Sequence, residues 1–247
     1  MLGLRRLTWV EIKLFLREPY SAFFTLVFPV MLLLLFGSIY GNQPAALFGG
    51  RGTVDIMVPG YAALIIGTTG LMSLTITVTS YRERGILRRL RLTTLRPADV
   101  LLSQVAVLFV MNVLGTVLLV VVGKVIYGLH LPADPLSVLA AFLLGSLSFF
   151  ALGFVLAGVA PTARAAQIIA MVIFYPMIFL SGSGMPIEIL PASVRRISQA
   201  LPLTYVTNLL RGAWAGESWR GHWTDVVVLM AVLVAGLLIS ARTFRWE

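Results

Sequence analysis

Cysteine is absent from the 247 residues, so disulfides and thiolate metal sites are excluded. Charged residues make up only 12% of the chain, which is about half their share in a typical soluble domain. The only Gly-Lys pair, Gly123-Lys124, is followed by valine and lacks the upstream glycine of a P-loop, the motif that holds nucleotide phosphates. We therefore expect no catalytic residue, no metal site and no bound cofactor in this chain, and no ATP hydrolysis by the chain alone.

Long stretches without any Asp, Glu, Lys or Arg account for the low charge. They cover residues 19–50, 56–81, 100–123, 135–163, 165–187 and 226–241. About 20 apolar residues span a bilayer core, and Trp223, Thr224 and Phe244 extend the last stretch to that length. The sequence therefore predicts an all-α membrane protein with six transmembrane helices, at about 20–40, 58–80, 98–127, 136–160, 165–182 and 223–242. The first is too long for a cleaved signal peptide, and we expect it to be a permanent span.

Ionisable residues are also missing from the middle of every predicted span. A proton- or sodium-coupled transporter binds its ion with such residues at membrane depth, so we expect the energy for any transport to come from outside the chain. The SGSG at 181–184 invites comparison with a membrane serine protease. Its serines would need a nearby base, whereas His130 and His222 lie in outer loops or at the edge of a span.

The basic residues set the predicted orientation, because Lys and Arg gather in short loops on the cytoplasmic side. The N-terminus, the loops 81–97 and 161–164 and the C-terminus together hold thirteen of the 19 basic residues. We therefore expect both termini in the cytoplasm. The formal net charge of +9 would indicate nucleic acid binding in a soluble protein, but these residues flank membrane spans, and we expect no nucleic-acid partner.

The loop 81–97, YRERGILRRLRLTTLRP, carries six arginines, more than topology requires. The arginines at i, i+4 and i+7 spacing are Arg84, Arg88 and Arg91. The second face carries Ile86, Leu87 and Leu90. This pattern predicts a short amphipathic helix, with an apolar face that suits the docking of a partner.

Two further segments depart from a plain six-span pattern. The basic and apolar stripes of residues 1–19 predict an amphipathic helix that lies in the membrane interface, with its basic stripe toward lipid headgroups. The segment 183–222 on the outer side is apolar but too short and proline-rich to span. We expect two short helices there, around 188–199 and 203–214, tucked partly into the outer leaflet as re-entrant helices.

Small and weakly polar side chains are concentrated in the second predicted span. One interpretation is packing, in which Ser and Thr bond to their own backbone and small-xxx-small pairs such as Gly153 and Ala157 allow close helix contact. The other is a mildly polar wall of a substrate pathway, with flexible and aromatic side chains that suit varied apolar ligands. The residues of that pathway would be Thr68, Thr69, Ser73, Asn112, Met171, Phe174 and Tyr175.

The order of these features resembles a known family. An amphipathic N-terminal segment, two spans, the basic loop 81–97 and three more spans are followed by FLSGSGMPIEILPASVRRISQALPLTYVTNLLRG at 179–212 and a last span. This order is similar to that of the type-2 permeases of ATP-binding-cassette exporters, in particular the bacterial daunorubicin-resistance permeases. The resemblance extends over essentially the whole chain and is most specific at 179–212.

The resemblance implies a single transmembrane permease domain over 1–247 in a bacterial inner membrane. It implies a dimer with a second permease copy or paralogue, and a separate ATPase subunit that binds ATP and Mg and receives a coupling helix from the loop 81–97. Substrate would pass between spans two and five. The expected function is export of amphipathic drugs or lipids. Export of a polysaccharide or glycolipid remains an alternative, as does, less favoured, a membrane protease or assembly factor.

Overall fold

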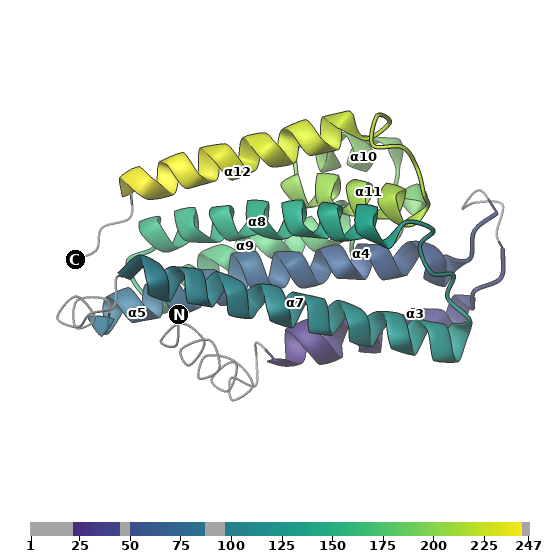
Figure 1. The fold of residues 1–247 in the computed structure, drawn as a ribbon, viewed down its shortest axis with the longest axis horizontal. Coiled ribbons are helices and arrows are strands. Elements are labelled where there is room, and N and C mark those ends of the chain that lie inside the picture. The colour runs from purple at the N-terminus through teal and green to yellow at the C-terminus, as the bar shows by residue number, and fades with distance from the viewer. Residues whose placement is uncertain (1–21, 45–49, 87–96, 244–247) are drawn as a thin grey trace.

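The computed structural model describes residues 22–44, 50–86 and 97–243 (Figure 1). The predicted interfacial helix at 1–19 lies outside the described residues, as does the part of the basic loop at 87–96. The described elements in chain order are η1 (Phe23–Val27), α3 (Phe28–Tyr40), α4 (Thr53–Gly67), η3 (Thr68–Leu74), α5 (Thr75–Glu83), α7 (Pro97–Tyr127), α8 (Pro135–Val159), α9 (Ala163–Leu180), η4 (Ile187–Ile189), α10 (Ala192–Ser198), α11 (Pro202–Trp214) and α12 (Trp223–Thr243). Here η1 and η3 are π-helical segments and η4 is a 3₁₀ turn.

Six of the described helical stretches are long and apolar enough to cross a membrane, as the sequence predicts. They are Phe23–Tyr40, Thr53–Glu83, Val100–Tyr127, Pro135–Val159, Ala163–Leu180 and Trp223–Arg242. The largest difference from the prediction is in the second span, which begins at Thr53 rather than near residue 58. Asp55 lies in its first turn, where the positive end of the helix dipole and the side chain of Asn42 stabilise the carboxylate. A charge that is paired in this way does not end a helix.

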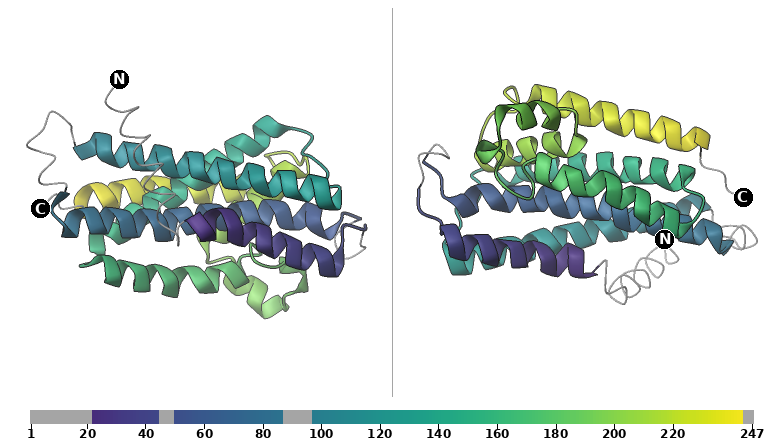
Figure 2. Two further views of the ribbon diagram at one scale, coloured as in Figure 1. Left: turned by 90° about the horizontal axis from the view of Figure 1, so that it is seen from below. Right: turned by 180° about the vertical axis from the view of Figure 1, so that it is seen from behind.

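The second span is the central element of the bundle. It runs through α4, η3 and α5 without interruption, and 83% of its most apolar window is buried, against 11% for Trp223–Arg242. α7 and α9 lie on opposite faces of this span, as Figure 2 shows, and α8 packs along η3. α12 packs mainly on α8 and is therefore peripheral. The small and weakly polar residues of span two thus face protein rather than lipid.

Small residues let α8 approach the central span closely. A Cβ atom added to Gly153 would lie 2.1 Å from the carbonyl oxygen of Gly70, so no side chain fits between the two backbones. The hydroxyl of Thr75 donates a hydrogen bond to the carbonyl of Gly153 at 3.2 Å, and Ala157, one turn further on, is fully buried. The close contact predicted from the spacing of Gly153 and Ala157 is confirmed.

The segment after α9 contains two short helices, α10 and α11, at the end of the bundle opposite α5 (Figure 1). The second matches its predicted limits within a residue. The first is shorter than predicted, because Leu190 is extended before Pro191 and the helix begins only at Ala192. A separate 3₁₀ turn, Ile187–Ile189, occupies the preceding residues. How deeply α10 and α11 enter a membrane stays a prediction.

Candidate functional site

The predicted pathway residues of span two are Thr68, Thr69 and Ser73, and all three lie in the π-helical segment η3 with at most 5% exposure. The hydroxyl of Thr68 donates to the carbonyl of Leu64 at 2.9 Å, and that of Thr69 to the carbonyl of Ile65 at 3.0 Å. These bonds within the helix are the ones that the packing interpretation predicts. The role of the three residues in a pathway stays a prediction.

The predicted pathway residues on α9 divide between two environments. Phe174 is buried, and its ring lies 2.5 Å from the position that a Cβ of Gly67 would take, directly before η3. Tyr175 is 41% exposed and Met171 is half-buried. The structure therefore brings Phe174 to the central span but leaves Tyr175 on the surface of the chain.

Asn112 lies in the middle of α7 and is fully buried. Within the described part of the chain, neither its amide oxygen nor its amide nitrogen has a hydrogen-bond partner. Leaving such a group unsatisfied costs about 1–3 kcal/mol. Asn112 is therefore a buried polar side chain in a helix that packs against both η1 and η3. Its role in a pathway stays a prediction.

Of the residues predicted to couple to an ATPase, two are described. Arg84 is exposed in the turn that ends α5, and Ile86, the last described residue before 97, is half-buried. Leu87, Arg88, Leu90 and Arg91 lie outside the described residues. The coupling helix therefore stays a prediction.

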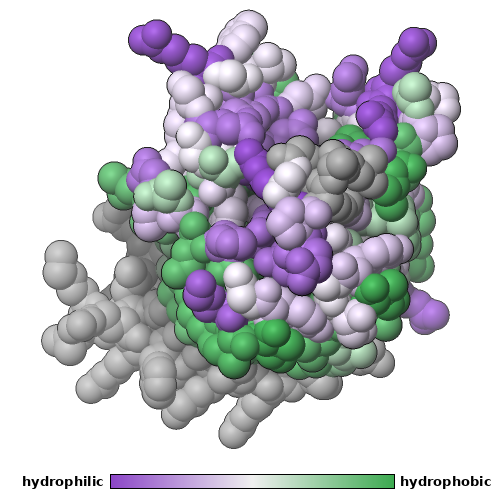
Figure 3. All heavy atoms as spheres, turned by 90° about the vertical axis from the view of Figure 1, so that its right-hand side faces the viewer, coloured by the Kyte–Doolittle hydropathy of each residue, from purple (hydrophilic) through white to green (hydrophobic). Residues whose placement is uncertain are grey.

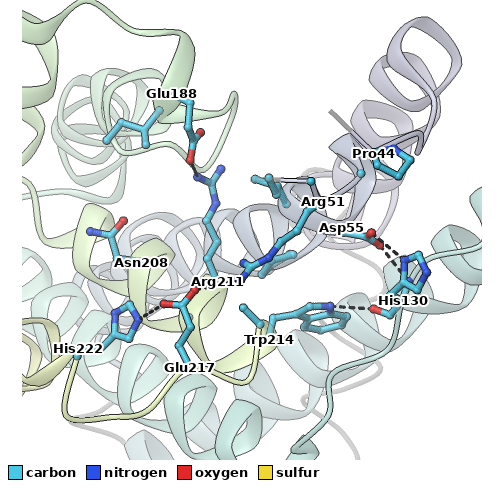
Figure 4. A pocket seen from close by; sticks show the side chains of 18 of the residues that line it. Pro44, Arg51, Asp55, His130, Glu188, Asn208, Arg211, Trp214, Glu217 and His222 are labelled. Carbon is cyan, nitrogen blue, oxygen red and sulfur yellow. Dashed lines mark hydrogen bonds and ion pairs between the residues drawn. The ribbon is translucent and has the colours of Figure 1, made fainter. Parts of the chain in front are cut away.

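A cavity of about 730 Å³ opens at the end of the bundle that carries α10 and α11. We call this end the cavity end and the opposite one the α5 end. Viewed from the cavity end, hydrophilic residues gather across the surface, and hydrophobic residues border them (Figure 3). Labelled residues that line the cavity are Pro44, Arg51, Asp55, His130, Glu188, Asn208, Arg211, Trp214, Glu217 and His222 (Figure 4). The cavity is thus lined by acidic and basic groups from helices and connections that are distant in the sequence.

Arg211 of α11 fixes one wall of the cavity. Its side chain is only 13% exposed; Nη1 faces Glu188 Oε1 at 3.4 Å, and Nη2 donates to the carbonyl of Gly182 at 2.8 Å. Gly182 has a φ of +82°, a conformation that glycine adopts without steric cost. Arg211 therefore connects α11 with the segment that follows α9.

His222 joins two carboxylates on another wall. Its Nδ1 lies 2.9 Å from Asp225 Oδ2, and its Nε2 lies 3.0 Å from Glu217 Oε2. Burial alone would lower the pKa of His222, but the hydrogen bonds with Glu217 and Asp225 raise it above its ordinary value. The same bond from His222, followed by that from Arg51, lowers the pKa of Glu217. Because both ring nitrogens face carboxylates, the full network requires the doubly protonated, positively charged ring.

Asp55 and His130 form a second link across the cavity end. Asp55 accepts from the backbone N–H of His130 at 2.9 Å, and Asp55 Oδ2 lies 2.9 Å from His130 Nδ1. The indole of Trp214 donates to the carbonyl of His130 at 3.0 Å. The connection after α7 is thereby attached to both α4 and α11.

Comparison with known proteins decides the family. The model of the ABC-2 type transporter family matches residues 3–214, most of the chain. The chain belongs to the ABC-2 type transporter family.

Curated relatives share low identity with this ABC-2 chain. The probable multidrug ABC transporter permease YbhS of Escherichia coli is 24% identical over 83% of this chain and 52% of its own length. The inner membrane transport permease YhhJ of the same species is 24% identical over 66% of this chain and 44% of its own length. Nodulation protein J of Rhizobium leguminosarum is 29% identical over 40% of this chain and 38% of its own length. The chain thus spans about half the length, or less, of these relatives.

The charged cavity of this ABC-2 chain is the feature that sequence reasoning missed. Arg211 lies within the segment that carries the family resemblance, but no spacing rule connects it with Glu188. From the sequence alone, His222 is a candidate only as a base for a serine nucleophile. A usable signal was present, because His222 and Asp225 are three residues apart where a helix begins, so their side chains lie on one side of its first turn.

Proposed function

We propose that this ABC-2 chain is the membrane-spanning subunit of an ATP-driven exporter that moves amphipathic drugs or lipids out of the cytoplasm or the inner leaflet. One observation carries the proposal: within the six spans, every acidic or basic residue lies in a first or last turn. These residues are Asp55, Arg82, Glu83, Lys124, Arg164, Asp225 and Arg242. An ion-coupled transporter binds its ion through ionisable groups at membrane depth. The spans offer none, so the driving force is supplied by a partner.

The partner that fits this proposal is a separate ATPase subunit, which binds ATP and Mg. The α5 end is its docking side and faces the cytoplasm of a bacterial inner membrane, with both termini on that side. A second permease copy or a paralogue pairs with this chain to form a dimer. Family membership supports the proposal, as does the similarity to YbhS, a probable multidrug ABC transporter permease.

The proposed pathway runs along η3 and α9. Thr68, Thr69 and Ser73 provide a mildly polar strip, and Phe174 provides an aromatic surface directly beside it. In the single chain this strip is covered by neighbouring helices. Exposure of the strip to substrate therefore requires the part of α9 around Phe174 to move away from η3.

The experiment is transport by the reconstituted complex. The chain is co-expressed with the ATPase subunit encoded beside it, co-purified, and placed in proteoliposomes with a fluorescent amphiphile or a labelled phospholipid. We expect movement of the probe that requires ATP and Mg. A matched ATPase variant that binds but does not hydrolyse ATP should abolish it.

The other outcomes separate the alternatives. Movement of a labelled glycolipid, with the amphiphile and phospholipid left in place, would assign the chain to the export of that class instead. Activity of the isolated chain without any ATPase, such as cleavage of a membrane substrate, would contradict the exporter proposal.

A further inference from the structure

Three spans meet at the α5 end. The central span finishes at Glu83, α8 finishes at Val159, and α9 begins at Ala163 after a connection of only three residues, 160–162. The last carbonyls of a helix and its first N–H groups have no partners within the helix. The ends of α8 and α9 therefore leave acceptors and donors to be satisfied next to α5.

Arg82 satisfies the acceptors. Its Nη1 donates to the carbonyl of Ala157 at 3.0 Å and to that of Gly158 at 3.1 Å, and its Nη2 donates to the carbonyl of Ala160. One guanidinium thus holds three carbonyls at the end of α8. The placement is electrostatically favourable because the C-terminus of a helix carries a partial negative charge.

Glu83, the next residue, satisfies a donor at the start of α9. Its Oε2 accepts from the backbone N–H of Ala163 at 2.8 Å. The hydroxyl of Thr162 caps the same helix by accepting from Ala165 at 3.1 Å. A carboxylate is favoured here because the N-terminus of a helix carries a partial positive charge. Adjacent residues of α5 therefore hold the end of one span and the beginning of the next.

We propose that Arg82 and Glu83 form a mechanical clamp that moves α8 and α9 together with the end of the central span. The inference rests on the proposed function, because the loop 84–96 that would dock the ATPase begins directly after the clamp. A displacement of that loop reaches α9, and with it Phe174, through these four hydrogen bonds. Arg82 and Glu83 are thus positioning residues for transport.

The clamp differs from the role that the sequence assigns to these arginines. A residue that only enforces topology needs a positive charge on the correct side and no particular partner. Arg82 instead uses the planar fork of its guanidinium to reach several acceptors, and lysine cannot reproduce that geometry. Arg164, exposed in the first turn of α9, provides the matched control, because it carries the same charge at the same end.

The test compares Arg82→Lys, Arg82→Gln and Glu83→Gln with Arg164→Gln in the complex with its ATPase. We expect the three clamp variants to insert, to co-purify with the ATPase and to keep basal ATP hydrolysis. Substrate moved per ATP hydrolysed should fall by at least about tenfold in Arg82→Gln, because the loss of even one of the three hydrogen bonds of this charged group corresponds to about that factor. Arg82→Lys should be affected nearly as much, and Arg164→Gln should match the wild type. Wild-type transport per ATP in Arg82→Gln would overturn the clamp.

A distance measurement provides a readout that does not depend on transport. Because the chain has no cysteine, spin labels can be placed at Ser80→Cys in α5 and Arg164→Cys in α9. We expect one narrow distance distribution that is the same without nucleotide and with trapped ATP, and a broader one when Arg82→Gln is added. A wild-type distance that changes between the two states, or a distribution that Arg82→Gln leaves unchanged, would overturn the clamp. If wild-type complex moves no probe, the proposed exporter function fails, and this distance still decides the clamp.

Discussion

The two ends of the bundle use arginine differently. At the cavity end, Arg51 and Arg211 face the carboxylates of Glu217 and Glu188, and Arg211 also donates to the backbone carbonyl of Gly182. At the α5 end, Arg82 pairs with backbone carbonyls of a neighbouring helix. Carbonyls neither titrate nor change rotamer. The α5 end is therefore suited to transmit movement, whereas the cavity end also contains ion pairs between side chains, which can rearrange.

The position of the two histidines also distinguishes the two ends of the bundle. Both histidines of the chain, His130 and His222, lie at the cavity end and face carboxylates. Histidine is the side chain whose ordinary pKa lies closest to neutral pH. A change of pH near neutrality should therefore act on the cavity end and leave the α5 end unchanged.

The largest effect on stability is expected from Arg211→Met. It removes the partner of Glu188 and the donor to Gly182 from a wall where Arg211 is only 13% exposed. Loss of one partner from a largely buried ion pair costs about 3 kcal/mol. Thermal unfolding of the purified chain in detergent, followed by size-exclusion chromatography, should show the loss. The double variant with Glu188→Gln should recover part of it, and a double variant no more stable than Arg211→Met would contradict the pairing.

A pH effect of intermediate size is expected from His222. Its pKa in the folded chain lies above the ordinary 6.5, so its stabilising contribution is complete below that value and is lost as the pH rises through the raised pKa. Glu217 has a lowered pKa, so its contribution is present above its ordinary 4.5 and is lost as the pH falls through the lowered pKa. The cavity end should be most stable between these limits.

Unfolding temperatures measured at pH values on both sides of these two pKa values test the direction of each effect. His222→Gln should destabilise the chain by roughly 1.5 kcal/mol on the acidic side, where the wild-type ring is charged, and much less on the alkaline side. His130→Gln is the control, because it removes the other histidine of the cavity end and leaves the contacts of His222 with Glu217 and Asp225 in place. A fall in wild-type stability as the pH decreases from neutral toward 6.5 would contradict the assignment.

The smallest effect is expected from Arg51→Met. Arg51 and Glu217 are 45% and 50% exposed, so water competes with their ion pair. Exposed pairs contribute about 0–1 kcal/mol, and salt screens them. Unfolding in low and high salt should show a small difference from the wild type that disappears in high salt. A loss as large as that of Arg211→Met would remove the distinction between the two pairs.

Much of the fold was predictable because the bilayer imposes a simple rule. A span needs about 20 apolar residues, so charge-free runs mark spans, and the run 165–187 gave a predicted span that agrees closely with Ala163–Leu180. The limit at Thr53 was missed because Asp55 interrupts the charge-free pattern. Its hydrogen bonds with Asn42 and His130, which permit the helix to continue, come from other parts of the chain.

The candidate site was less predictable. The polar residues of η3 were recognised from composition, but their bonds within the helix and the contact of Phe174 with Gly67 depend on how α9 packs. In the sequence, Arg82 is only one of six arginines in a basic loop. The carbonyls that it binds belong to residues more than seventy positions later, and carbonyls have no sequence signal.

By itself, the sequence determined the six spans, the family resemblance and the absence of charge from the middle of the membrane, because these depend on local composition. Only the tertiary structure decided which span is buried at the centre, which arginines pair and with what, and where a cavity forms. Those features depend on contacts between segments far apart in the chain. A bilayer constrains the length and polarity of each helix, but the neighbours of a helix are chosen by close packing, as at Gly70 and Gly153, and by the partners that its end groups find.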